Sequence, residues 1–376
     1  MGSRKHDVNG SGAFSKSLHL AQRRSEHAII SKDYRETLLR SKRMRLGPCQ
    51  QDAPCTSEEA GKQDLRKATC DLVSAIKQKT ILLTQAARQV RIIVSGGQCT
   101  IDANHLRDTL LPALIRVLLL RQGGRETAEA VLEVAWAITN LAAGQHDIVK
   151  TVLLSAPALI AHLSGWLGLQ VAEQCAWALG NMAGDDSALC NTLAANGAVI
   201  PLARLLLRAT SRHEGTAADC ESAAATAAWA LSNLLWGDPS QVGHLIEVPQ
   251  FPKGLVSLLE EEHDAWLHTE AAWLLAFICG GADTHMHTMV KHGAANAVVK
   301  RLCCILTQDG ALEGSIALLT PLLRCLGNMG TSKVAAKSLL SEQSMAVVRR
   351  CAGSEIGALQ GEAQWVTAML SKLAQT

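Results

Sequence analysis

The stretch WALGNMAGD at 177–185 decides the fold, because four related stretches recur along the chain. They are WAITNLAAG from Trp136, WALSNLLWG from Trp229, WLLAFICGG from Trp273 and, in altered form, RCLGNMGTS from Arg324. Successive copies are 41, 52, 44 and 51 residues apart, and each continues with a short helical stretch and a second apolar one. A period near 40 residues with three helices per unit predicts an armadillo or HEAT solenoid, in which stacked units bury each other's apolar faces.

The composition of the 376-residue chain agrees with an all-helical body and adds one anomaly. From residue 65 onward Ala and Leu dominate, Gly separates the apolar stretches, and no strand-like alternation stands out. Eight Trp against three Phe and one Tyr is an unusual ratio, because Trp favours binding surfaces. Four of the eight share one repeat position, and Trp365 stands where a further Trp of that row would fall. The other three fall outside it and are interpreted as packing residues: Trp166, Trp236 and Trp266.

The repeated stretches place Trp and Asn four residues apart, so that both lie on one face of a helix. The three pairs are Trp136 and Asn140, Trp177 and Asn181, and Trp229 and Asn233. Stacked repeats turn these pairs into parallel rows of indoles and amides. An Asn amide can bond the N–H and C=O of an extended backbone, and indole slots accept the stems of Lys or Arg. With Asp185 able to meet an ammonium, the pattern predicts a groove for a short, extended, basic peptide. The alternative, Trp packing between repeats and Asn capping a helix, does not account for a column of asparagines.

The net charge of +2 hides two opposite halves. Residues 1–45 carry 11 Lys/Arg and 4 acids, a charge of +7, and the remaining 331 residues carry a charge of −5. A basic arm on an acidic body favours self-association and also an acidic partner. We predict a basic, partly helical arm over 1–46, a flexible linker over 47–64, and repeats over 65–376.

With these repeats and this basic arm, the sequence resembles the importin α (karyopherin α) family. Its members are armadillo adapters for classical nuclear localisation signals. The segments QRRSEH (22–27) and YRETLLRSKR (34–43) are similar to the two basic clusters of its importin-β-binding segment. LTQAARQVRIIVSG (83–96) resembles the opening repeat, and the Trp/Asn stretches resemble repeats two to four. The resemblance implies an all-α, right-handed armadillo-repeat solenoid of about six to seven repeats. It implies an adapter, shuttling between cytoplasm and nucleus, that binds basic cargo signals in its groove and importin β through its arm. The arm would inhibit the groove when free.

The resemblance also implies the site residues. The major signal-binding site would comprise Trp136, Asn140, Gly144, Gln174, Trp177, Asn181, Asp185, Trp229 and Asn233. The groove would continue through Glu270, Trp273, Phe277, Arg324 and Asn328. The cations of the arm would be Arg23, Arg24, Arg35, Arg40, Lys42 and Arg43.

Departures from the family pattern limit what the resemblance implies. Val149 stands where the family usually has Thr, and Met369 stands at the Asn position that follows Trp365. The later repeats, which build the minor site, have no counterpart here. We therefore expect a working major site, and the sequence leaves the minor site open.

Other function classes are less well supported. A catenin-type armadillo scaffold for acidic or phosphorylated segments would need a basic groove. No phosphate-binding loop, hydrolase motif or metal-spaced Cys/His cluster occurs, so no enzymatic activity, cofactor or metal is predicted. Direct nucleic-acid binding would rest on the arm alone. The uncharged stretch 151–172 is broken by Pro157 and Gly165, so no membrane insertion is predicted either.

Overall fold

The computed structural model describes residues 58–78, 82–96, 101–121, 124–211, 215–306 and 315–375. The chain divides into two units, Met1–Pro54 and Cys55–Thr376. The first unit, with the predicted basic arm, lies outside the described residues. Within the second unit the described residues form helices joined by short loops, with no β-strand among them.

The helices of Cys55–Thr376 form an opening pair followed by repeats, which are called units from here on. Each of these units is built around three helices, and the first helix is split in several of them. The opening pair is α2 (Glu58–Gln78) and α3 (Leu83–Ser95). The next three units contain α4 (Ala103–His105), η1 (Leu106–Leu110), α5 (Leu111–Leu118) and α6 (Arg125–Leu141); α7 (His146–Val152), η2 (Leu153–Ser155), α8 (Ala156–His162) and α9 (Leu169–Ala183); α10 (Ser187–Ala195), α11 (Val199–Thr210) and α12 (Ala217–Gly237). The remaining units contain η3 (Pro239–Gln241), α13 (Val242–Ile246), α14 (Phe251–Glu260) and α15 (Ala265–Cys279); α16 (Asp283–Lys291), α17 (Ala294–Leu306) and α19 (Ile316–Met329); η4 (Lys333–Ala335), α20 (Ala336–Leu339), α21 (Glu342–Ala352) and α22 (Gly357–Ala374).

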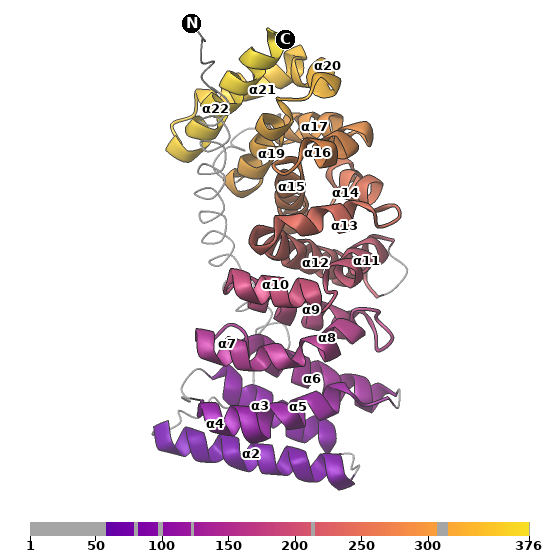
Figure 1. The fold of residues 1–376 in the computed structure, drawn as a ribbon, viewed down its shortest axis with the longest axis vertical. Helices are drawn as coiled ribbons and strands as arrows, with labels where there is room; N and C mark the ends of the chain where they lie inside the picture. The colour runs from indigo at the N-terminus through magenta and orange to yellow at the C-terminus, as the bar shows by residue number, and fades with distance from the viewer. Residues whose placement is uncertain are drawn as a thin grey trace, which may run out of the picture. The chain divides into compact units, whose positions relative to one another are not determined.

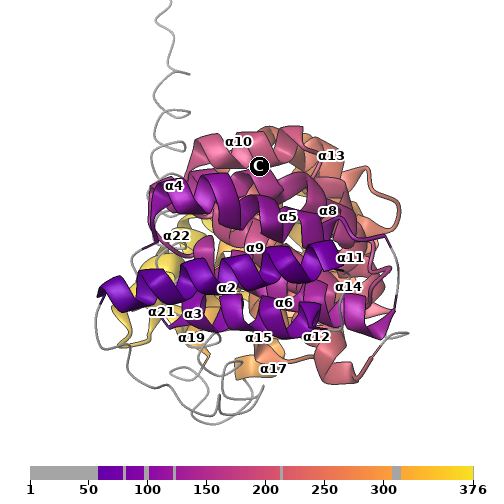
Figure 2. The same ribbon diagram turned by 90° about the horizontal axis from the view of Figure 1, so that it is seen from below.

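Each unit packs against the next through its third helix. Contacts join α3 to α6, α6 to α9, α9 to α12, α12 to α15, α15 to α19 and α19 to α22. Figure 1 shows the units following one another in chain order, from indigo to yellow, and Figure 2 shows the same helices from the end at which α2 lies. The predicted all-α solenoid is confirmed.

Long apolar faces explain why these helices stack. The third helices bury most of their length, as α12 does with an Ala-rich run from Ala223 to Leu235 that needs little space between neighbours. The start of α12 is fixed by a capping box, in which Thr216 and Asp219 exchange side-chain and backbone hydrogen bonds. The polar insert of this unit therefore gives way to helix at Ala217, because these two residues satisfy the first free N–H groups.

The start of α2 differs from the sequence prediction, and the break after α8 agrees with it. Helix α2 begins at Glu58, whereas the predicted linker extended to residue 64. The reason is an amphipathic pattern that buries Leu65, Ala68 and Leu72 on one face. Pro157 lies in the first turn of α8, and Gly165 adopts φ +75° just after it, so the uncharged stretch is divided as predicted.

The described residues contain no single helix long and apolar enough to cross a membrane. The pair α10 and α11 reaches the necessary length and apolar character together, but it is bent by 81°.

Candidate peptide-binding groove

The third helices place equivalent residues of successive units in two rows. The first row, in chain order, is Arg91, Trp136, Trp177, Trp229, Trp273, Arg324 and Trp365. The second row, four residues later on each helix, is Ser95, Asn140, Asn181, Asn233, Phe277, Asn328 and Met369. Because each third helix packs against the next, the sequence-predicted Trp and Asn residues of three separate units come together along one surface.

Two of the indoles lie directly against a glycine of the preceding unit. A Cβ added to Gly180 would lie 2.2 Å from the ring of Trp229, and one added to Gly327 would lie 1.9 Å from the ring of Trp365. Both glycines precede the second-row Asn directly. The same position holds small residues elsewhere, namely Thr139, Ser232 and Ala276. Gly180 and Gly327 therefore make room for the indole of the next unit, a role that sequence reasoning missed.

Three of the second-row asparagines donate a hydrogen bond from the side-chain amide to a backbone carbonyl of the preceding unit. Asn181 Nδ2 donates to the Thr139 carbonyl at 2.9 Å, and Asn233 Nδ2 donates to the Gly180 carbonyl at 3.0 Å. Asn328 Nδ2 donates likewise to the Ala276 carbonyl at 2.9 Å. In each case the acceptor is the carbonyl of the residue directly before the second-row position of the preceding unit, and Gly180 is the one of the three that lies against an indole, that of Trp229.

These bonds fix which way the amide points. The first amide of the row, Asn140, donates instead to Ser95 Oγ at 2.6 Å, and its Oδ1 is buried without a partner among the described residues. An Asn amide carries one acceptor oxygen and two N–H donors, and the internal bond uses one of these N–H groups. The sequence predicts both a donor and an acceptor at each amide, and the internal bond orients them.

The four indoles of the row from Trp136 to Trp273 are buried, with exposed fractions between 3% and 7%. A cation that reaches their faces would leave most of its water behind. Cation–π attraction at such sites is worth about 2 kcal/mol, against about 0.5–1 kcal/mol at exposed ones.

The run of tryptophans ends in an arginine on both sides. The Arg91 guanidinium lies 4.4 Å from the ring centre of Trp136, and that of Arg324 lies 4.9 Å from Trp273. Each arginine pairs with a glutamate of the next unit, Arg91 with Glu133 and Arg324 with Glu362. Sequence reasoning found Arg324 but missed Arg91, although Arg91 holds the same repeat position in the opening stretch.

The comparisons with known proteins bear on this arrangement. No protein-family model matches the chain. Importin subunit alpha-9 of Arabidopsis thaliana is 32% identical over 371 residues, covering 92% of this chain and 66% of the relative. Importin subunit alpha-2 of Oryza sativa subsp. japonica is 30% identical over 368 residues, covering 92% of this chain and 65% of the relative.

The chain belongs to the importin α family. It spans about two thirds of the length of these curated relatives. Among solved structures, an engineered protein aligns with TM-score 0.66 and 22% identity, covering 84% of this chain and 71% of its own. A designed armadillo repeat protein in complex with the peptide (KR)4 aligns with TM-score 0.55 and 19% identity, covering 69% of this chain and 99% of its own. These likenesses show the armadillo fold.

Asp185, the predicted partner of a ligand ammonium, follows the C-terminal end of α9. Its Oδ2 lies 2.5 Å from Nδ1 of His146, the first residue of α7. Gly144 stands two residues before His146, in the turn after α6, and Val149 is fully buried in α7. Gln174 donates from Nε2 to Thr139 Oγ1 at 2.8 Å and so links α9 to α6.

Helix α15 carries the remaining predicted groove residues. Glu270 is buried, burial raises its pKa to about 8, and its Oε2 has no hydrogen-bond partner in the part of the chain that the structure describes. A hydrogen bond with Trp266 lowers that pKa by a smaller amount. The ring of Phe277 lies 6.3 Å from that of Trp273, and Trp266 lies 6.5 Å from Trp177. Trp266, interpreted from sequence as packing, thus contacts an indole of the first row.

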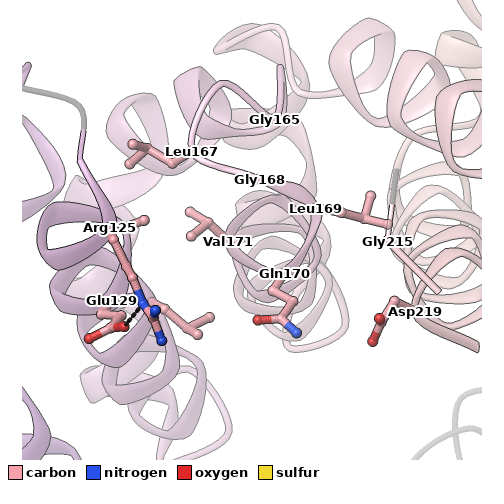
Figure 3. A pocket seen from close by; sticks show the side chains of 12 residues that line it. Arg125, Glu129, Gly165, Leu167, Gly168, Leu169, Gln170, Val171, Gly215 and Asp219 are labelled. Carbon is pink, nitrogen blue, oxygen red and sulfur yellow. Dashed lines mark hydrogen bonds and ion pairs between the residues drawn. The ribbon is translucent and has the colours of Figure 1, made fainter. Parts of the chain in front are cut away.

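A cavity of about 680 Å³ lies at the N-terminal ends of α6, α9 and α12. Figure 3 shows Arg125 paired with Glu129 on one side, Asp219 on the other, and Gln170 between them. The Arg125–Glu129 ion pair measures 2.9 Å. Glu129 and Gln170 stand seven residues before Trp136 and Trp177, on the same helix faces, so the cavity borders the groove.

The basic residues assigned to the arm lie outside the described residues. They are Arg23, Arg24, Arg35, Arg40, Lys42 and Arg43. Their roles stay predictions from the family resemblance.

Proposed function

We propose that the two rows form a groove for lysine- and arginine-rich segments, and that the chain acts as an adapter for cargo carrying nuclear localisation signals. The observation that carries the proposal is the register of the rows. Buried indoles stand at equivalent positions of successive units, beside amides that hydrogen bonds hold in one orientation. Such a surface offers apolar walls for cationic side chains and hydrogen bonds for a backbone.

The spacing suits an extended ligand. Packed helices lie about 8–10 Å apart, and an extended peptide advances about 3.3 Å per residue. One unit of the solenoid therefore corresponds to about three peptide residues. A cation would enter the space between two neighbouring indoles, and the amide beside it would bond the peptide backbone.

Two of the comparisons support this function. The matched relatives are named importin subunit alpha, and a designed protein of the same fold is known in complex with the basic peptide (KR)4. Asp185 adds a carboxylate at the second Trp/Asn pair, where an ammonium could be paired.

The basic arm would act as an internal competitor for the groove. A tethered segment reaches effective concentrations in the millimolar range, so weak intrinsic affinity is enough for it to block cargo. Capture of the arm by importin β would free the groove and strengthen cargo binding, which is a population shift. In this account the loaded adapter travels between cytoplasm and nucleus.

The experiment is a titration of a fluorescein-labelled oligolysine peptide against the full chain and against the chain lacking residues 1–46, followed by anisotropy. We expect tighter binding without the arm. We also expect Asp185→Lys to abolish binding, because it puts a cation where the ligand's cation must lie. Glu355→Lys, the same charge change at an exposed loop residue before α22, is the matched control and should bind normally. Equal binding by the two variants would place the ligand elsewhere.

A further inference from the structure

The first indole of the row already holds a cation that belongs to the chain itself. The Arg91 guanidinium lies 4.4 Å from the ring centre of Trp136, and Arg91 Nε donates to Glu133 Oε2. Trp136 and Glu133 lie three residues apart on α6, whereas Arg91 belongs to α3 of the opening pair. A single side chain of α3 therefore takes both an indole face and a carboxylate oxygen of the next unit.

These two partners are the ones that a cationic side chain of a ligand would use. A guanidinium can stack its face on an indole while its N–H groups donate to a carboxylate, and the stem of a lysine or arginine packs on the same ring. Only 18% of the Arg91 side chain and 12% of the Glu133 side chain are exposed. Because the contact is shielded from water, Trp136 and Glu133 form a complete cation site, and Arg91 fills it.

The amide beside this indole also binds a side chain of α3. Asn140 Nδ2 donates to Ser95 Oγ at 2.6 Å, and Ser95 lies one turn after Arg91. The Ser95 hydroxyl in turn donates to the Arg91 carbonyl. Both row members of this unit, the indole and the amide, are therefore in contact with side chains of the opening pair.

A second arginine shows that Arg91 does more than balance the charge of Glu133. Arg88 Nε donates to the other carboxylate oxygen, Oε1, at 2.7 Å, and 53% of the Arg88 side chain is exposed. Glu133 therefore keeps a cationic partner when Arg91 is removed. What Arg91 adds beyond charge balance is a cation on the face of Trp136.

The far end of the tryptophan run has a similar arrangement. The Arg324 guanidinium lies 4.9 Å from the ring centre of Trp273, and Arg324 pairs with Glu362 of the next unit at 3.0 Å. Between Arg91 and Arg324 the row holds four successive tryptophans, and so three spaces between neighbouring indoles. A peptide cation that reaches past these spaces meets a like charge of the protein, which is a means of rejecting a ligand.

We propose that Arg91 acts as an internal ligand, which occupies a cation site made of Trp136 and Glu133 and thereby sets where the basic run of a bound peptide must end. This inference rests on the proposed function, since it assumes a basic peptide along the row. It adds a limit on length. Three spaces, at about three peptide residues per unit, correspond to a basic run of about nine residues.

Matched substitutions separate a filled site from a lost charge. Arg91→Ala clears the face of Trp136 and frees Glu133 Oε2, while Arg88 still pairs with Oε1. Arg88→Ala is the matched control, because it removes the same charge from the same carboxylate and leaves Arg91 in place. Circular dichroism checks that the variants fold. If Arg91→Ala does not, Arg91→Gln takes its place, since it keeps much of the side-chain length without the charge.

The measurement is anisotropy of labelled oligolysines of about nine and about twelve residues, which match three and four units, with the full chain. The readout is the ratio of the two dissociation constants, because competition by the arm would weaken both peptides alike and cancels. For the wild type and Arg88→Ala we expect the longer peptide to gain only a little, from the larger number of positions that it can take. For Arg91→Ala we expect the ratio to rise about fivefold above the wild type, since one more shielded cation–π contact becomes available.

The outcomes distinguish this inference from the proposed function. If Arg91→Ala gives the same ratio as the wild type, Arg91 does not fill a ligand site, and the inference is wrong while the groove stands. An equal rise in Arg91→Ala and Arg88→Ala would assign the effect to lost charge and would overturn the inference as well. If the wild type binds neither peptide, the proposed function fails and this inference fails with it.

Discussion

Gly180→Ala is the most revealing single perturbation of the groove. Gly180 lies inside α9, directly beneath the indole of Trp229 in the next unit. A Cβ at this position would lie 2.2, 2.7 and 2.9 Å from three carbons of that ring. Carbon atoms in contact prefer about 3.5–4.0 Å, so the indole has to move by more than about 1 Å.

The expected magnitude combines two opposing effects. Forcing extra volume into a packed site costs about 1–3 kcal/mol. Replacing Gly by Ala within a helix returns about 0.5–1 kcal/mol. The net loss of unfolding free energy should be up to about 2.5 kcal/mol, toward the upper end because the shortest approach is to a rigid ring. Displacing one indole also removes a cation–π contact of about 0.5–2 kcal/mol, which corresponds to a loss of peptide affinity of about twofold to thirtyfold.

The assay is urea unfolding followed by circular dichroism, together with oligolysine binding by anisotropy. Gly361→Ala is the matched control, because Gly361 lies within α22 and an added Cβ would meet no described atom within 4 Å beyond its chain neighbours and its own helix backbone. This control should gain about 0.5–1 kcal/mol and leave binding unchanged. If Gly180→Ala stabilises the chain as much as Gly361→Ala does and binds peptide equally well, the indole does not lie where the structure places it.

Other predictions follow from buried charges and from the amide row. Burial raises the pKa of Glu270 to about 8, above its value in an unfolded chain, so its contribution to stability is complete below about pH 4.5 and is lost as the pH rises to about 8. Glu270→Gln should flatten the fall in unfolding free energy between about pH 5 and 9, and identical curves for the two proteins would contradict this. Arg324→Ala should cost about 3 kcal/mol because it leaves Glu362 buried without this ion pair, and adding Glu362→Leu should restore part of the loss in urea melts. An additive double variant would exclude the coupling. Asn233→Ala removes the bond to the Gly180 carbonyl and should cost about 1 kcal/mol in stability while weakening peptide binding, and unaltered binding would show that the amide row does not contact the ligand.

Much of the groove could be predicted from sequence, because similar local stretches fold alike and stack in register. The four-residue spacing of Trp177 and Asn181 places both on one helix face, and repetition of this spacing in successive units turns the pair into rows, although the units differ in length. The role of Gly180 was also visible in principle, since a small residue precedes the second-row position in each copy.

Other features depend on distances that no local pattern contains. The contact of His146 with Asp185 joins two turns 39 residues apart, and nothing in either turn specifies the other. Arg91 was missed because its surroundings do not share the Trp/Asn stretch, although tertiary packing brings it onto Trp136. Glu270 was predicted as a groove residue, and only its burial in the fold raises the pKa of its carboxyl to about 8.

The central claim is that a basic peptide binds along the row of tryptophans, and the indole N–H signals of the protein test it most directly. These signals can be followed by NMR during a titration with oligolysine and assigned through single Trp→Phe substitutions. The account predicts that the signals of Trp136, Trp177 and Trp229 change together, while that of Trp166, an exposed residue outside the row, stays in place. A titration that moves Trp166 alone, or leaves the three row signals unchanged while the peptide binds, would contradict it.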